Sequence, residues 1–100
     1  MKIVRLDIDT SDREKIVIGI DEKRFETGVE ARNSQKILYF IDEILKRNNF
    51  TVQDIKEIKV NTGPGSFTGL RIGIAIANTL AFGLGITVNG KKTEDSIDYS

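Results

Sequence analysis

Hydrophobic and polar residues alternate along the first third of the chain, as they do in β-strands. Residues 3–9 place most of their aliphatic side chains on one face and their charged side chains on the other. Residues 15–21 are apolar on both faces, so a central position in a sheet is expected for them. Residues 24–30 alternate again. Since only short polar turns separate these segments, they are predicted to form an antiparallel meander of three strands.

The spacing of hydrophobic residues becomes helical in the middle of the chain. Apolar residues recur there at intervals of three and four, with charged residues mostly on the opposite side. This pattern predicts an amphipathic helix over about residues 34–48, with Asn33 and Ser34 as the residues that can cap its start. Asn48 and Asn49 are expected to end it.

Two further strands are predicted in the second half of the chain. Thr51 and Asp54 fit the start of a single helical turn, which leads into a strand at residues 57–61. Residues 86–88 are expected to form a short fifth strand. The element order is then βββαβαβ, and right-handed helical crossovers should place the later strands parallel beside the first. We therefore predict an α/β fold with a five-stranded mixed sheet and two main helices.

A second helix follows the Gly-Pro-Gly turn at residues 63–65. Ser66 is a good N-cap, and the helix is expected over about residues 67–82, ending at the glycines that follow. Nearly every side of this helix is apolar, and the clearly polar sector is narrow. Small residues recur at intervals of four and form a stripe: Gly69, Gly73, Ala77 and Ala81.

A helix that lies on a sheet normally has a polar back, which this helix lacks. On a monomer, the exposed remainder of so apolar a helix would be an adhesive patch. We therefore favour a helix shared between its own sheet and a partner protein. A fully buried core helix and a membrane span are the alternatives, and Arg71, Asn78 and the internal glycines argue against the span.

The composition narrows the possible chemistry. One hundred residues suffice for one domain with one core. Fifteen basic and fifteen acidic residues cancel, so no global charge attracts nucleic acid or an anionic membrane. The absence of cysteine and histidine excludes thiolate catalysis, zinc–cysteine sites and the commonest general base. The N-terminus lacks the apolar run of a signal peptide, so a cytoplasmic location is expected.

Two small groups of residues are candidates for chemistry. The Gly-rich turn precedes a helix N-terminus, where anions often bind, so a phosphate or nucleotide site could involve Asp9, Thr10, Gly65 and Ser66. The turn matches neither the P-loop nor the dinucleotide signature, which favours a tight turn that admits a packed helix. Asp7 and Asp9 share a strand face and could hold hydrated magnesium, but a solvated carboxylate and a turn cap are favoured. No cofactor or metal is predicted.

Several motifs resemble one known family. Residues 63–75, GPGSFTGLRIGIA, are similar almost residue for residue to the most recognisable segment of the TsaB family, also called YeaZ. Residues 8–11 resemble the family's opening Leu-Asp-Thr-Ser, and residues 34–38 resemble the start of its first helix. TsaB proteins are glycoprotease-like subunits of the bacterial machinery for threonylcarbamoyladenosine in transfer RNA. The resemblance spans roughly residues 3–90.

The resemblance implies a single actin-like (ASKHA, ribonuclease H-like) N-terminal lobe at residues 1–90, truncated before the second lobe of typical members, with a polar tail at 91–100. It implies a non-catalytic subunit that pairs through its two helices with the transferase subunit TsaD. The ATPase TsaE is expected to join the pair, and a homodimer is expected to form through the same helices. No direct contact with nucleic acid or a membrane is expected.

The partner surface is predicted from the helical pattern and the resemblance together. It comprises Gly69, Leu70, Arg71, Gly73, Ile74, Ala77, Asn78 and Ala81 on the second helix and Lys36, Tyr39 and Phe40 on the first. Two alternatives remain open. The chain could be a small nucleotide- or phosphate-binding enzyme domain, or a self-associating module with no role in RNA modification.

Overall fold

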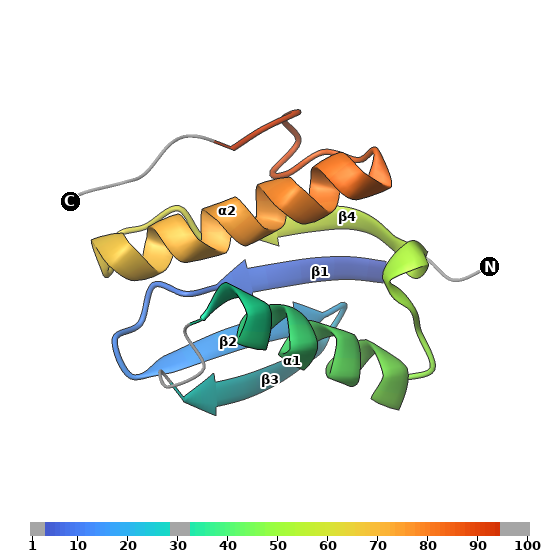
Figure 1. The fold of residues 1–100 in the computed structure, drawn as a ribbon, viewed down its shortest axis with the longest axis horizontal. Coiled ribbons are helices and arrows are strands. Elements are labelled where there is room, and N and C mark those ends of the chain that lie inside the picture. The colour runs from blue at the N-terminus through green and yellow to red at the C-terminus, as the bar shows by residue number, and fades with distance from the viewer. Residues whose placement is uncertain (1–3, 29–32, 95–100) are drawn as a thin grey trace.

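One mixed sheet of four strands forms the base of the molecule, in the order β3-β2-β1-β4 (Figure 1). The structure is a computed structural model that describes residues 4–28 and 33–94. Strands β1 (Val4–Asp9), β2 (Lys15–Ile20) and β3 (Lys23–Gly28) pair antiparallel through short turns. Strand β4 (Ile55–Val60) pairs in parallel with β1. The predicted meander, the central position of β2 and the parallel strand beside β1 are confirmed.

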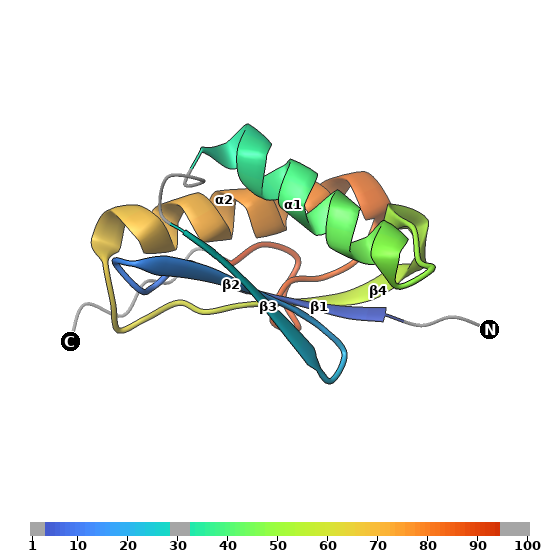
Figure 2. The ribbon, with the colours of Figure 1, turned by 90° about the horizontal axis from the view of Figure 1, so that it is seen from below.

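Both helices cover the same face of this sheet (Figure 2). Helix α1 (Ser34–Arg47) and helix α2 (Phe67–Leu84) each turn one side toward the strands. The core between them is almost entirely aliphatic, and its side chains include Leu6, Ile8, Ile18, Ile37, Ile41, Ile44, Ile58 and Ile76. This layer arrangement leaves the opposite face of the sheet, with Asp7, Arg24 and Lys59, free of helices from the described residues.

The helix ends form as the sequence predicts. The side chain of Asn33 accepts hydrogen bonds from the backbone N–H groups of Gln35 and Lys36, which caps α1. Ser66 caps α2 by accepting from the N–H of Gly69 at 3.3 Å. Gly85 ends α2 in the left-handed conformation, with φ of 69°, which glycine adopts without steric cost.

The short turn before β4 also matches its prediction. A 3₁₀ turn, η2 (Val52–Asp54), begins with Thr51, whose backbone N–H donates to Asp54 Oδ2 at 2.8 Å. This bond satisfies a backbone donor that the turn itself leaves without a partner.

The fifth strand predicted at residues 86–88 is wrong for the described part of the chain. Only Val88 makes a bridge to β4, parallel to Ile58. The chain then reverses at Asn89 and Gly90, whose φ angles of 52° and 78° are typical of a tight turn. The ladder stops after one residue because the turn carries the following residues away from β4.

The polar tail predicted from residue 91 is held against the body as far as it is described. Glu94 is only 4% exposed, and its backbone is hydrogen-bonded to α2. Residues 95–100 of the predicted tail, and the ends of the strands predicted at residues 3 and 29–30, lie outside the described residues.

Among the described residues, α2 is the one helix that is long and apolar enough to cross a membrane. Its mean hydropathy is 1.4, and 39% of its residues are buried inside the molecule. The core helix of a soluble protein passes the same test. Since α2 supplies part of the core, packing on the sheet accounts for part of its apolarity.

Candidate functional site

The stripe of small residues on α2 faces the chain's own sheet. Gly69, Gly73, Ala77 and Ala81 are all buried, as are Leu70 and Ile74 beside them. A Cβ atom placed on Gly73 would lie 2.3 Å from Thr10 Oγ1, so the missing side chain lets α2 approach the end of β1 closely. These six residues, which were predicted for the partner surface, are core residues of the folded chain.

Asn78 is also used within the chain. Its side-chain Oδ1 accepts from the N–H of Glu94 at 2.9 Å, and its Nδ2 donates to the carbonyl of Glu94 at 2.8 Å. The side-chain amide of Asn78 thus satisfies both backbone polar groups of Glu94, as a neighbouring strand would. Asn78 was predicted to lie on the partner surface, but both of its polar side-chain atoms are engaged within the chain.

Four of the predicted surface residues remain accessible to a partner. Lys36 and Arg71 are exposed, and Tyr39 is 68% exposed. Phe40 is half-buried and packs against the core. The guanidinium of Arg71 lies 5.5 Å from the centroid of the Phe67 ring, within the range of a cation–π contact.

An apolar groove lies between the two helices. Its volume is about 300 Å³, and its wall consists of Gln35, Leu38, Tyr39, Ile41, Asp42, Val52 and Leu80. Leu38 is 37% exposed at this groove. On α2, two large apolar side chains are exposed as well: Phe67 is 44% exposed and Phe82 is 89% exposed. The helical layer therefore presents apolar area, but from side chains other than the small-residue stripe.

Leu38, Leu80 and Phe82 were not among the predicted surface residues. Since α2 is apolar on nearly all sides, its hydrophobic pattern does not indicate which side meets the sheet. Leu38 was predictable in principle, because it lies at the boundary of the apolar side of α1, next to buried Ile37 and Ile41.

The predicted phosphate-binding residues lie together, and their polar groups bond to neighbouring residues of the chain. Asp9 Oδ1 accepts from the N–H of Ser11 at 3.0 Å and from Asn61 Nδ2 at 3.2 Å. The N–H of Ser66 donates to the carbonyl of Ser11 at 2.9 Å. A Cβ atom on Gly65 would lie 2.6 Å from Cβ of Ser11. These contacts support the interpretation of the Gly-rich segment as a tight turn.

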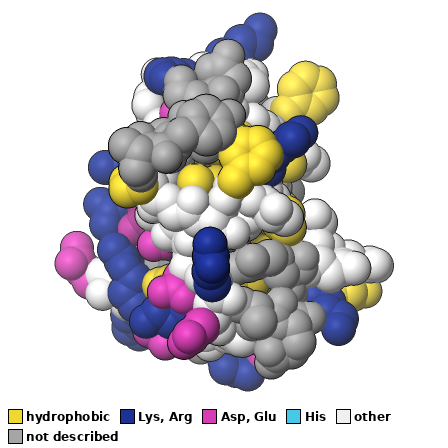
Figure 3. Space-filling view, turned by 90° about the vertical axis from the view of Figure 1, so that its left-hand side faces the viewer, with side chains coloured by type: hydrophobic (Ala, Val, Ile, Leu, Met, Phe, Trp, Pro, Cys, Tyr) yellow, Lys and Arg dark blue, Asp and Glu magenta, His cyan; other side chains and the backbone are white. Residues whose placement is uncertain are grey.

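Thr10 completes this packing. Its side chain is fully buried, and its hydroxyl donates to the carbonyl of Gly69 in the first turn of α2. Figure 3 views the end of the molecule where α2 begins, and basic and acidic side chains lie interspersed on it. The Asp9 carboxylate would repel a phosphate placed at this end, which disfavours an anion site there.

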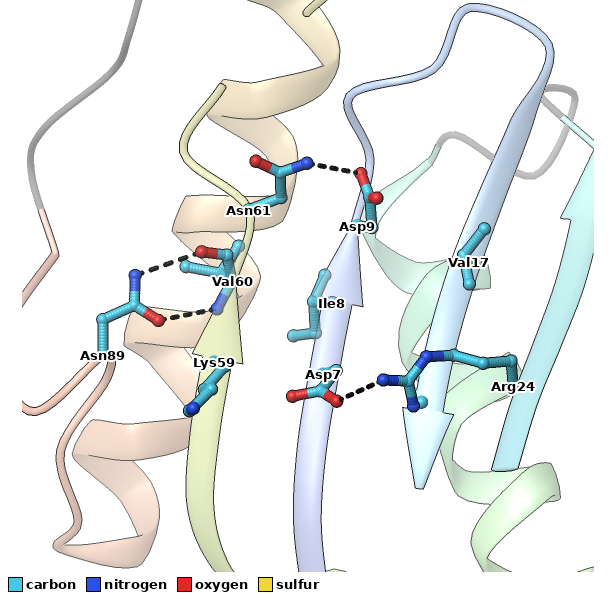
Figure 4. A pocket seen from close by; sticks show the side chains of 10 residues that line it. Asp7, Ile8, Asp9, Val17, Arg24, Lys59, Val60, Asn61 and Asn89 are labelled. Atoms are coloured by element: carbon cyan, nitrogen blue, oxygen red, sulfur yellow. Dashed lines mark hydrogen bonds and ion pairs between the residues drawn. The ribbon is translucent and has the colours of Figure 1, made fainter. Parts of the chain in front are cut away.

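The open face of the sheet carries a polar hollow of about 330 Å³ (Figure 4). Asp7 lies in it between two arginines, 3.1 Å from Arg24 and 3.4 Å from Arg5. Arg24 covers Gly19, where a Cβ atom would lie 2.3 Å from the guanidinium. Asp7 and Asp9 share this face as predicted, but Asp7 pairs with arginines whereas Asp9 bonds to the adjacent loops. Among the residues that the structure describes, no three acidic side chains cluster to hold a metal ion.

Comparison with known proteins shows that this chain is similar to proteins of threonylcarbamoyladenosine biosynthesis. The family model described as "TsaD: tRNA N6-adenosine threonylcarbamoyltransferase" matches residues 28–93. The Escherichia coli tRNA threonylcarbamoyladenosine biosynthesis protein TsaB is 41% identical over 61 residues, which are 61% of this chain and 26% of that protein. The Bacillus subtilis protein of the same name is 31% identical over 100 residues, covering 92% of this chain and 42% of that protein.

Solved structures give the same relationship. YeaZ from Pseudomonas aeruginosa superimposes with a TM-score of 0.70 and 25% identity, over 86% of this chain and 42% of that one. The chain thus spans well under half the length of these relatives.

Proposed function

This chain belongs to the TsaB family within the group matched by the TsaD family model, and on that premise we propose that it is a non-catalytic partner subunit in the biosynthesis of tRNA threonylcarbamoyladenosine. Its proposed partner is a TsaD-like transferase that docks on the helical layer. A TsaE-like ATPase is proposed as a third member of the assembly. The chain is further proposed to be cytoplasmic and to form an actin-like lobe.

The apolar groove between α1 and α2 carries this proposal. Leu38, Tyr39 and Leu80 present apolar area that the chain's own sheet does not cover. Exposed aromatic side chains beside a preformed hollow are typical of the anchors that supply most of the energy of a protein interface. The small stripe of α2 contributes indirectly, since it holds the helix on the sheet and so positions the groove.

Charged residues of α1 lie beside the apolar area, and one of them, Asp42, lines the groove. Lys46 pairs with Asp42 at 2.9 Å, and Arg47 pairs with Glu43, both one helical turn apart. Such exposed pairs add little stability, but charges at a rim influence the rate and the orientation of docking. A second copy of the chain could use the same groove, and a homodimer is therefore the competitor of the transferase complex.

The absence of catalysis is proposed from what the polar residues do. Asp9, Ser11 and Asn61 bond to one another and close the loops at the end of β1 and β4. Asp7 forms ion pairs with Arg24 and, at 3.4 Å and without a hydrogen bond, with Arg5. These contacts stabilise the fold and leave the candidate carboxylates committed to internal partners.

The proposal is tested by binding to the TsaD-like transferase of the same organism. Tyr39→Ala and Leu38→Glu are expected to weaken the affinity by about 30-fold or more, the factor for an interface anchor worth about 2 kcal/mol. Lys59→Ala is the matched control, because Lys59 is exposed on the opposite face of the sheet. Calorimetric titration measures all three, and far-UV circular dichroism checks that each variant is folded.

Unchanged affinity in both groove variants would refute docking at the groove. An equal loss in Lys59→Ala would locate the contact on the open face of the sheet instead. Light scattering of the chain alone, with and without Tyr39→Ala, separates the homodimer from the complex.

A further inference from the structure

The last described segment of the chain, residues 86–94, closes against β4 and α2 (Figure 1). We refer to it as the C-terminal segment. Two asparagines hold it, and each uses both atoms of its side-chain amide. Asn78 of α2 pairs with the backbone of Glu94, as described above. Asn89, within the segment, pairs with the outer edge of β4.

Asn89 replaces the missing fifth strand at this edge. Its backbone N–H donates to the carbonyl of Ile58 at 2.9 Å. Its side-chain Oδ1 accepts from the N–H of Val60 at 2.9 Å, and its Nδ2 donates to the carbonyl of Val60 at 3.1 Å (Figure 4). The same Nδ2 donates to Glu94 Oε2 at 3.0 Å. The side-chain amide of Asn89 is therefore held by three hydrogen bonds.

Asn89 is followed by Gly90, and this pair has a specific reactivity. The backbone nitrogen of Gly90 can attack the side-chain carbonyl carbon of Asn89, because glycine has no side chain to hinder the approach. The nitrogen loses its proton, the bond from the carbonyl carbon to the side-chain nitrogen breaks, and ammonia leaves. Water then opens the five-membered imide to aspartate or isoaspartate. The attack requires the side-chain amide to rotate toward the backbone, away from Val60 and Glu94.

We propose that Asn89 is a deamidation site that the closed C-terminal segment protects, and that its conversion holds the segment open. Protection follows from the three bonds, all of which must break before the amide can turn. The lasting effect follows from the product. A carboxylate only accepts hydrogen bonds, yet it would face the carbonyl of Val60 and the carboxylate of Glu94. Two lost donor contacts and a like-charge repulsion oppose reclosure.

The consequence is an irreversible change at the edge of the sheet. When the segment is open, the outer polar groups of Ile58 and Val60 lose their partners. An uncovered strand edge is a template for pairing with another chain. Conversion of Asn89 is therefore expected to increase self-association through β4, at a surface separate from the groove between the helices.

The first test compares the rate of conversion in the folded chain and in concentrated urea at mildly alkaline pH, by peptide mapping with mass spectrometry. Conversion at Asn89 is expected to be slower in the folded chain by about tenfold or more, because it requires local opening. Asn49 is an internal reference with a similar φ of 63°, but the following Phe50 crowds the attacking nitrogen. Equal rates in the folded and unfolded chain would overturn the proposal.

The second test loosens the segment at its other end. Asn78→Ala removes both hydrogen bonds to Glu94 and leaves Asn89 unchanged. It is expected to speed the deamidation of Asn89 in the folded chain several-fold. Thr79→Ala is the matched control, because its hydroxyl bonds only to Ala75 of its own helix among the contacts described. If Asn78→Ala and Thr79→Ala convert at the same rate, the segment does not protect Asn89.

The third test introduces one of the two products, aspartate, directly. In Asn89→Asp, backbone amides in residues 86–94 and at the outer edge of β4 are expected to exchange with deuterium faster than in the parent chain. Amides between β1 and β2 serve as the reference for the intact fold. Unchanged protection of the C-terminal segment would show that a carboxylate at residue 89 is tolerated, and the proposed lasting effect would be wrong.

Discussion

Gly73 is the residue at which the packing of α2 is most directly tested, because a single methyl group there meets buried Thr10. In Gly73→Ala, the new Cβ atom would lie 2.3 Å from Thr10 Oγ1 and 3.3 Å from its Cγ2. The first distance is far below van der Waals contact. Thr10 is fully buried and cannot turn into solvent, so either the side chain or the helix must shift.

The magnitude follows from three opposing terms. Replacing glycine by alanine inside a helix favours folding by about 1 kcal/mol. Overpacking of a closely packed site costs about 1–3 kcal/mol. If Thr10 moves, its hydroxyl also loses the carbonyl of Gly69, and an unsatisfied buried polar group costs about 1–3 kcal/mol. The sum predicts a net destabilisation of about 0–2 kcal/mol if the hydrogen bond survives and about 1–5 kcal/mol if it breaks.

The same helix supplies a matched control. A Cβ atom on Gly83 would meet no other atom within 4 Å, so Gly83→Ala gains the helix propensity without a clash. Its expected effect is a stabilisation of up to about 1 kcal/mol. Urea unfolding followed by far-UV circular dichroism measures both free energies. For a domain of this size, each kcal/mol also moves the melting temperature by about 4–8 °C.

The two glycine variants separate packing on the sheet from contact with a partner. If Gly73→Ala were as stable as Gly83→Ala, Thr10 would not fill the space opposite Gly73 and the described packing would be refuted. If Gly73→Ala were as stable as the parent chain but no longer bound the transferase, Gly73 would belong to the interface after all. A second substitution, Thr10→Ala in the Gly73→Ala background, should recover the part of the loss that is due to the clash.

Two further predictions concern the N-terminus of α2. Ser66→Ala removes the side-chain acceptor for the N–H of Gly69 and is expected to cost about 1 kcal/mol in urea unfolding; a loss below about 0.3 kcal/mol would mean that water replaces the cap. Calorimetry with ATP and magnesium is expected to show no binding to the chain alone, because Asp9, Ser11 and Asn61 bond to one another; saturable heat that disappears in Asp9→Asn would revive the nucleotide-binding alternative.

The local elements of this protein were predictable from its sequence because their determinants are local. Alternation along residues 4–28 reflects strands with one face on the core, and the helical spacing after Asn33 reflects one buried side of α1. Caps at Ser66 and Thr51 depend on residues three positions apart. The parallel neighbour of β1 followed from the handedness and reach of a helical crossover.

The orientation of α2 was decided only by the tertiary structure. Its apolar residues cover nearly all sides, so the sequence offers no contrast between the side that meets the sheet and the side that meets solvent. The choice depends on shape, since Thr10 of the β1 end fits where Gly73 has no side chain. The stripe that the helical pattern placed at a partner surface is therefore in the core, and the groove beside Leu38 and Leu80 is the surface that we propose instead.

Polar contacts between distant residues could not be predicted from the sequence either. Asn78 was predicted to lie on the partner surface, and Asn89 directly follows the strand predicted at residues 86–88. Their side chains instead bond to backbone groups 16 and 29 residues away, at Glu94 and Val60. An amide side chain serves equally well in water, in a turn or against a strand edge, and its sequence neighbours do not distinguish these uses. Local pattern determined the helices and strands of this protein, whereas the fit between them determined which residues remain available for a partner.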